Sequence, residues 1–233
     1  MIKKILAAFA VACTAQLASA NVENITQAIQ KAQPQLPISN IQATEVKNIY
    51  MGELDKRPIY LTEDAQYFFV GNLVRVSDLK NLSNDHQMKM QRIDWSALPL
   101  KDALKKVKGK GERKLVVFSD PNCPYCQTLE KELQKLDNVT IYTFVLAFKT
   151  QSVEPSKQLF CEKNPVQAWE DLILKKVQPS SKKTCANPVQ RNLELAKKLG
   201  VSGTPTLVLQ NGYKLVGAYS TEQLEAIWVE NKL

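Results

Sequence analysis

Residues 115–133 read LVVFSDPNCPYCQTLEKEL, and this stretch decides the fold of the larger part of the chain. Its first four residues form a short apolar run, which predicts a buried strand. The segment 124–136 then predicts a helix, and Pro124 suits its first position because the N–H that proline lacks is unpaired there anyway. Cys123 therefore falls at or next to the N-cap of this helix, and Cys126 lies one turn further in.

The spacing of Cys123 and Cys126 suits reversible redox chemistry. The unpaired N–H groups and the positive end of the helix favour an anion at its start, so they should lower the pKa of Cys123 and make it the attacking thiolate. Cys126 lies deeper and can resolve a mixed disulfide by attacking back. Tyr125, between the two cysteines, either contacts substrates or faces solvent, and Asp120 and Glu112 are candidate proton relays.

A C-x-x-C motif has other uses, which the rest of the sequence disfavours. A zinc site would need Cys161 and Cys185, which do not form a second C-x-x-C, or His86, the single histidine of the chain. Haem attachment requires a histidine after the second cysteine, and Gln127 stands there. We therefore predict no metal and no cofactor.

The first twenty residues predict a secretory signal peptide. Lys3 and Lys4 supply a positive start, residues 5–14 are apolar, and Ala18-Ser19-Ala20 forms a small-x-small cleavage site. The apolar run is shorter than the ~20 residues that a membrane span needs. A lipoprotein signal that uses Cys13 is the alternative.

Export into an oxidising compartment changes how the cysteines are interpreted. Cleavage of the signal leaves four of the five cysteines, and an even number suggests disulfides. Four cysteines allow three connectivities. The simplest joins the close pair Cys123 and Cys126 and leaves Cys161 and Cys185 as a second, structural pair.

Composition describes an ordinary globular protein, with 44% hydrophobic and 23% charged residues, and excludes a disordered tail, a fibre and a polytopic membrane protein. The formal charge of +8 permits contact with nucleic acid but does not demand it. Lysines cluster in a predicted amphipathic helix over 98–108, and their solvated face is favoured over a nucleic-acid patch because no aromatic residue interleaves with them.

The predicted domains are a signal peptide at 1–20, a small α+β unit at 21–80, a linker with a helix at 81–112, and a larger α/β unit at 113–233. Helical spacing marks 21–35, and short β-prone runs follow over 43–79. A unit of about 60 residues buries little surface, so we expect a partner to complete its sheet. His86 lies in the polar connector and is expected to be exposed.

The larger unit continues with a strand over 139–148, mostly helical residues over 154–199, and a hairpin over 206–216 with its turn at Asn211-Gly212. Thr221 is the expected N-cap of a last helix. Pro205, in Gly203-Thr204-Pro205-Thr206, stands at the mouth of a strand, where a residue without an N–H needs a reason.

In combination, these features resemble the thioredoxin fold, and FSDPNCPYCQTLEKEL, FCEKNPVQAWEDL and LGVSGTPTLVLQNG resemble the bacterial periplasmic disulfide isomerases of the DsbC/DsbG family. The resemblance implies a cis Thr204–Pro205 bond beside the redox pair Cys123 and Cys126, with the backbone of Thr204 available to an extended substrate. It matches Cys161 and Cys185 to the structural disulfide typical of DsbC. The dipeptide Pro-Tyr inside C-x-x-C is instead similar to DsbG, so the two substrate patterns are mixed.

The implied protein is a periplasmic homodimer, paired through its N-terminal domains, with linker helices that carry two thioredoxin-like domains. Its implied activity is isomerisation or reduction of wrong disulfides in misfolded exported proteins, with a membrane thiol reductase of the DsbD kind keeping Cys123 and Cys126 reduced. A disulfide oxidase and a chaperone-like binding module are the alternatives. No nucleic-acid partner is expected.

Overall fold

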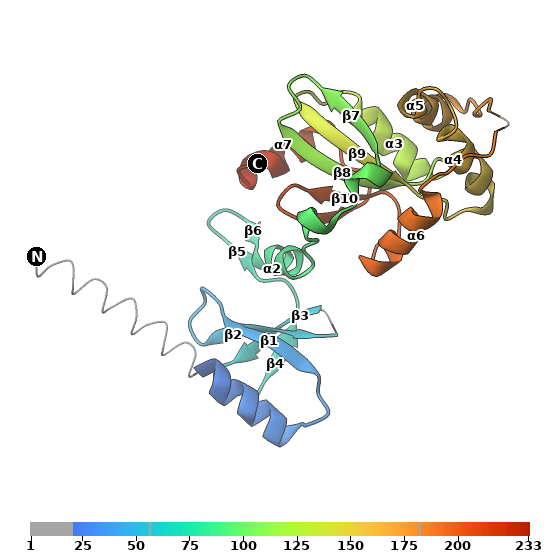
Figure 1. Cartoon of the computed structure of the whole chain (residues 1–233). Coiled ribbons are helices and arrows are strands. Elements are labelled where there is room, and N and C mark those ends of the chain that lie inside the picture. Colours follow the sequence, from blue (N-terminus) through green and yellow to red (C-terminus); the bar gives the residue numbers. More distant parts are fainter. Residues whose placement is uncertain (1–20, 56, 182) are drawn as a thin grey trace, which may run out of the picture. The chain divides into compact units, whose positions relative to one another are not determined.

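The computed structural model describes residues 21–55, 57–181 and 183–233, so the predicted signal peptide and Cys13 lie outside the described residues. The chain divides into two compact units, one up to Met90 and one from Gln91 onward. This division splits the predicted linker, because residues 81–90 belong to the first unit and residues 91–112 to the second. Each unit is described by itself (Figure 1).

The first unit packs helical residues 21–32 on an antiparallel sheet. Ile25 and Ile29, four residues apart on one helix face, are buried against side chains of the second and third strands. The helix and the β-prone runs predicted here are confirmed. The strands pair in the order in which they follow in the chain: β1 (Ile38–Ala43), β2 (Ile49–Leu54), β3 (Arg57–Thr62) and β4 (Phe68–Val70).

Strand β4 is an edge of this sheet, and its surface is apolar. Tyr67 is 72% exposed and Val70 is 68% exposed, and the two phenylalanines between them are also exposed. An edge strand has unpaired backbone groups that can join another chain, and natural proteins usually protect such edges with charge. The described part of this unit therefore has an open, apolar edge.

The first unit ends in a hairpin of β5 (Val74–Arg75) and β6 (Lys80–Asn81), followed by α2 (Leu82–Met90). The expectation that His86 is exposed is wrong, because this helix buries Ser83 and His86. Ser83 shares a hydrogen bond with the Tyr60 hydroxyl, and His86 Nδ1 lies 2.5 Å from Gln42 Nε2. Because the residues that this helix buries are polar, its sequence has no apolar stripe that would indicate the buried face.

The second unit is built on a five-stranded sheet in the order β11-β10-β8-β9-β7. Strands β8 and β9 are parallel, and the other pairs are antiparallel. The bounds are β7 (Leu104–Lys108), β8 (Arg113–Ser119), β9 (Val139–Val145), β10 (Thr206–Leu209) and β11 (Lys214–Val216). The predicted hairpin is confirmed. Its turn needs glycine, since Gly212 has φ +86° and a Cβ there would lie 2.4 Å from the Ile93 carbonyl oxygen.

The helix predicted over 98–108 is wrong. That segment contains the short 3-10 turn η2 (Leu100–Asp102) and the edge strand β7, while the helix of the predicted linker is α2. In β7 the positions that alternate with Leu104 on one face are Lys106 and Lys108. Their ammonium groups bond to Gln134, Glu170 and backbone oxygens, and Val107 is exposed. Because lysines occupy the covered face, the segment lacks the alternation of apolar and polar residues on which a strand prediction depends.

Helices cover both faces of this sheet (Figure 1). Phe118 and Phe144 stack on one face, where the residues around Ala196 of α6 pack. A second core joins the two cysteines of the motif to Trp169 and Leu172. The helices are α3 (Pro124–Leu133), α4 (Val153–Leu159), α5 (Pro165–Lys175), α6 (Val189–Lys198) and α7 (Thr221–Glu230), and Ser220 rather than Thr221 caps the last one.

Candidate active site

Cys123 and Cys126 lie where β8 passes into α3. Cys123 is the N-cap residue with extended backbone angles, and Pro124 is at the first helical position, as predicted. Cys123 is 8% exposed and Cys126 is 1% exposed, and both thiols are free. Because Cys123 keeps a small exposed fraction and Cys126 is almost completely covered, Cys123 is the more accessible of the two to an incoming disulfide.

The loop before β10 faces the thiol of Cys123. The Thr204–Pro205 peptide bond is cis, and the Cys123 thiol donates to the Thr204 carbonyl oxygen at 3.3 Å. The Pro205 carbonyl accepts from Gly217 N at 2.9 Å, and Thr206 pairs with Phe118, which holds this loop on the sheet. The structure thus brings Thr204 and Pro205, 81 residues downstream, to the side of Cys123.

The environment of Cys123 lowers its pKa. Burial raises the pKa of this thiol, but the Thr204 hydroxyl and the N–H groups of Cys126 and Tyr125 outweigh it by stabilising the thiolate. The hydrogen bond from the thiol to the Thr204 carbonyl works the other way, because the thiolate cannot donate. The helix start, which supplies those N–H groups, therefore makes Cys123 the better nucleophile.

Burial raises the pKa of Cys126 to about 12. The Ser119 hydroxyl and the Asp120 N–H act in the opposite direction and do not compensate. Cys126 therefore stays protonated at neutral pH, and Cys123 is the thiol of the pair that ionises first. Two thiols of one motif thus have different roles because Cys126 is buried more deeply than Cys123.

Asp120 lies under the motif and is fully hydrogen-bonded. Its Oδ1 accepts from Asn122 N at 2.8 Å and Ser152 Oγ at 2.6 Å, and its Oδ2 accepts from Phe148 N at 2.8 Å and Lys149 N at 3.2 Å. Such a carboxylate joins two loops and has little capacity left to carry protons. Glu112, the other candidate relay, precedes β8, whereas the cysteines follow it, and Glu112 binds Asn138.

Two further features surround Cys123. Tyr125 is 68% exposed, so its ring stands free at the surface between the cysteines. Lys149 Nζ donates to the carbonyl oxygen of Asn122, the residue before Cys123, at 2.7 Å. The residues next to the motif in the sequence include no cation. Lys149 comes from the loop after β9, which is distant in the sequence. Only the parallel pairing of β8 and β9 could have indicated it.

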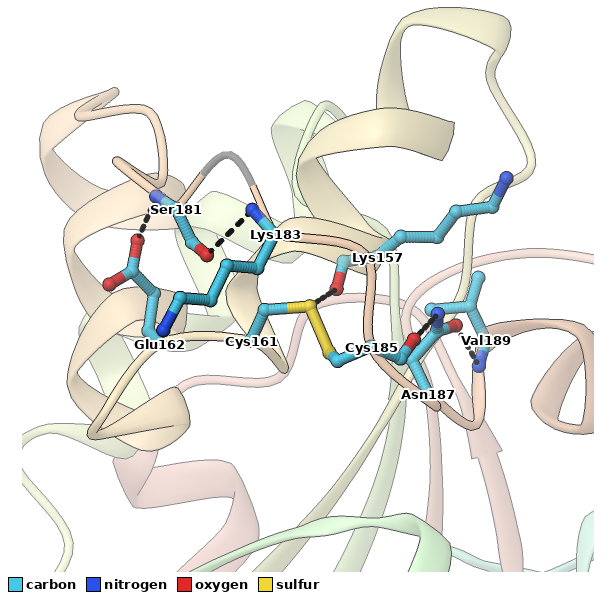
Figure 2. Close-up of a disulfide and its surroundings, with 8 residues drawn as sticks. All are labelled: Lys157, Cys161, Glu162, Ser181, Lys183, Cys185, Asn187 and Val189. Carbon is cyan, nitrogen blue, oxygen red and sulfur yellow. Dashed lines mark hydrogen bonds between the residues drawn. A yellow bond between two sulfur atoms is a disulfide. The ribbon is translucent and has the colours of Figure 1, made fainter.

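Cys161 and Cys185 form a disulfide with a Cα–Cα distance of 5.7 Å, far along the chain from the redox motif (Figure 2). The bridge ties the end of α4 to the segment before α6 across the helical insertion. Glu162, next to Cys161, accepts from the N–H groups of Ser180 and Ser181 at 2.6 and 2.8 Å. The bridge and this carboxylate both fasten the same returning segment.

The disulfide predicts a clear stability effect. Replacing Cys161 and Cys185 with Ser should lower the free energy of unfolding by about 3 kcal/mol, because the closed loop no longer restricts the unfolded chain. The folded double variant should still reduce disulfides, which urea unfolding and a reduction assay measure in parallel. Loss of activity in a demonstrably folded variant would contradict a purely structural role.

Comparison with known proteins identifies the family to which this chain belongs. The model of the thioredoxin-like domain matches residues 100–230, and that of the disulfide bond isomerase protein N-terminal domain matches residues 16–84. The chain belongs to the thioredoxin-like family, and its N-terminal part matches the N-terminal domain of disulfide bond isomerases. The expected fold class is thereby confirmed: a thioredoxin-like domain with a helical insertion after a small α+β domain.

Individual relatives in this family are moderately similar. A probable thiol:disulfide interchange protein DsbC of Bordetella parapertussis is 32% identical over 72% of this chain, which spans 60% of that relative. The DsbC of Salmonella typhimurium is 27% identical over 83% of this chain and 82% of its own length. A crystal structure of a disulfide interchange protein from Neisseria gonorrhoeae is 36% identical and covers 58% of this chain and 99% of its own, with a TM-score of 0.54.

In residues 21–55, 57–181 and 183–233, no group of three or more His, Cys, Asp or Glu side chains could hold a metal ion. No helix in these ranges has the length and apolar character to cross a bilayer.

Proposed function

We propose that this protein is a thiol:disulfide isomerase and reductase acting on wrong disulfides in misfolded exported proteins. The observation that carries the proposal is the difference between the two thiols of the motif. Cys123, at the helix start, has a lowered pKa and the larger exposed fraction, whereas Cys126 is buried more deeply and has a pKa of about 12. The printed names of the relatives, thiol:disulfide interchange proteins, support the same chemistry.

The reaction begins when the Cys123 thiolate attacks one sulfur of a substrate disulfide. A mixed disulfide forms, and the other substrate sulfur leaves as a thiolate. If a substrate thiolate then attacks the mixed disulfide, a new substrate pairing forms, Cys123 is released and no electrons are gained or lost overall. This is isomerisation.

Reduction is the other way in which the mixed disulfide can be resolved. Cys126 loses its proton and attacks the Cys123 sulfur, which releases the reduced substrate and leaves a Cys123–Cys126 disulfide. The high pKa of Cys126 delays this step and gives the substrate time to rearrange. An oxidised pair must be reduced before the next cycle, so the proposal includes a membrane thiol reductase of the DsbD kind.

The proposed assembly is a homodimer in the periplasm. The signal-like segment 1–20 supports export, and the exposed apolar edge β4, in the unit that the N-terminal family model matches, supports pairing with a second copy. In this proposal residues 21–80 mediate dimerisation, residues 81–90 act as the linker and the unit from Gln91 onward carries the catalytic domain. Thr204, Pro205 and Tyr125 contact the substrate, and no nucleic acid or cofactor is involved.

A refolding assay tests the function. The reduced protein is added to a ribonuclease with scrambled disulfides, and the recovery of ribonuclease activity should be faster than with buffer or with the Cys123→Ala variant. The redox state of the pair in cells is measured by thiol labelling and should be reduced. A pair that is oxidised in cells, together with no gain in refolding, would indicate a disulfide oxidase instead.

A further inference from the structure

The loop after β9 forms a second wall beside Cys123. The buried Asp120 carboxylate binds the backbone N–H groups of Phe148 and Lys149 through one oxygen and that of Asn122 through the other. The two loops that follow the parallel strands β8 and β9 are thereby fixed to each other at one edge of the sheet. We call Phe148 and Lys149 the 148–149 rim.

The rim presents an apolar ring and a cation. Phe148 is 47% exposed, although large apolar side chains of a domain are usually covered, and Tyr125 stands exposed on α3 at the same edge. The Lys149 ammonium is fixed on the Asn122 carbonyl, one residue before Cys123. A substrate cysteine joined to Cys123 has its Cα within about 7 Å of the Cα of Cys123, so its neighbours lie within reach of this rim.

Two more lysines add to the positive charge near the rim. Burial, and then the charges of Lys131 and Lys149, lower the pKa of Lys176, so Lys176 lies within electrostatic reach of each of the other two lysines. In the described chain none of the three forms an ion pair with a carboxylate, whereas the nearby Asp171 is bound to Lys175 at 2.7 Å. Asp120 lies below the rim, covered by its four donors.

We propose that the 148–149 rim selects substrates by the residues that flank the disulfide-bonded cysteine. Phe148 receives an apolar side chain, and Lys149, assisted by Lys131 and Lys176, receives an acidic one. The favoured class of substrate is therefore an extended segment with an apolar and an acidic residue next to the cysteine. This inference rests on the proposed function and names the substrates of that same site.

Peptide kinetics test the selection. Three disulfide-linked peptides differ only in one residue beside the cysteine, which is Glu, Gln or Lys, and single-turnover rate constants are measured with the reduced full-length protein. Glu should react about two- to fivefold faster than Gln, and Lys more slowly, as expected for an exposed charge pair. The differences should shrink in ~1 M salt.

Variants assign the selection to the rim. Lys149→Gln should bring the ratio of the Glu to the Gln peptide close to one, Lys149→Glu should invert it, and Lys149→Arg should keep it. Lys214→Gln is the matched control, because Lys214 also donates to a backbone carbonyl, that of Gly200, at 3.5 Å, and it should leave the ratio as in the parent. Phe148→Ser should slow a Leu-flanked peptide relative to a Ser-flanked one, and Phe148→Leu should not.

Thiolate absorbance against pH separates selection from activation. In Lys149→Gln the pKa of Cys123 should stay as in the parent protein. A raised pKa with equal slowing of all three peptides would overturn the proposal, because Lys149 would then stabilise the thiolate. Equal parent rates for the three peptides would overturn it and leave the proposed function intact, whereas failure to reduce any of them would contradict the function itself.

Discussion

Replacing Cys126 with Ala is expected to trap the protein in covalent mixed disulfides with its substrates. Attack by Cys123 remains possible, since the Thr204 hydroxyl and the N–H groups of the helix start still lower its pKa, but the buried thiol that would release the adduct is gone. Replacing Cys123 with Ala should abolish attack altogether, because the remaining thiol is buried and has a pKa of about 12. Non-reducing electrophoresis after acid quenching measures the adducts.

The variant that lacks both cysteines is the control and should form no adduct. Adducts of equal yield with either single replacement would contradict the assignment of Cys123 as the attacking thiol. The surface and buried positions of the two sulfurs would then not decide which of them reacts.

The pKa values also fix the direction of the pH dependence. Because the pKa of Cys123 is lowered, the attack rate should rise with pH and level off before the ~8.5 of a free thiol, and it should fall as pH drops through the folded pKa. For stability, the contribution of Cys123 is present above ~8.5 and lost as pH falls through that same pKa. Cys126 contributes below ~8.5, and its contribution is lost as pH rises towards about 12.

Charging the edge strand β4 is expected to have the second large effect. Tyr67→Lys together with Val70→Lys should convert the proposed dimer to monomer, because the positive charges of two copies would meet along an apolar edge. The monomer should still reduce a small disulfide peptide, while isomerisation of a scrambled protein should fall several-fold. Sedimentation gives the oligomeric state, and the two assays run on the same sample.

Val229→Lys is the matched control, since Val229 is a similarly exposed valine of the second unit. It should change neither sedimentation nor isomerisation. A parent protein that sediments as a monomer would refute the proposed assembly. A truncated control should begin at Gln91, because β7 belongs to the sheet of the second unit.

The redox motif was predictable because its geometry is local. A strand, a proline and a helix within residues 115–133 are enough to place Cys123 at the N-cap. The cis Pro205 was expected from family resemblance, since the peptide isomer does not follow from residue order. The disulfide between Cys161 and Cys185 was the simplest second pair among four cysteines, and the resemblance implied the same pairing.

The other features depend on contacts between distant segments. Lys149 reaches Asn122 only because two parallel strands end at the same edge, and His86 is buried only because a helix without an apolar stripe covers a sheet. Strand β7 escaped prediction because lysine stems and ammonium groups occupy its covered face. In each case polar side chains have partners in distant segments of the folded protein. The residue pattern within one segment does not show these partners.

The bridge between Cys161 and Cys185 has a consequence for proteolysis. Lys175 and Lys176 are exposed and lie between the bridged cysteines, so a trypsin-like protease that cuts after either of them opens the chain without releasing a fragment. The two pieces stay covalently joined and migrate together until a reductant separates them. After such a cut, the disulfide still joins the piece that contains the motif to the piece that contains the Thr204–Pro205 loop, which faces Cys123.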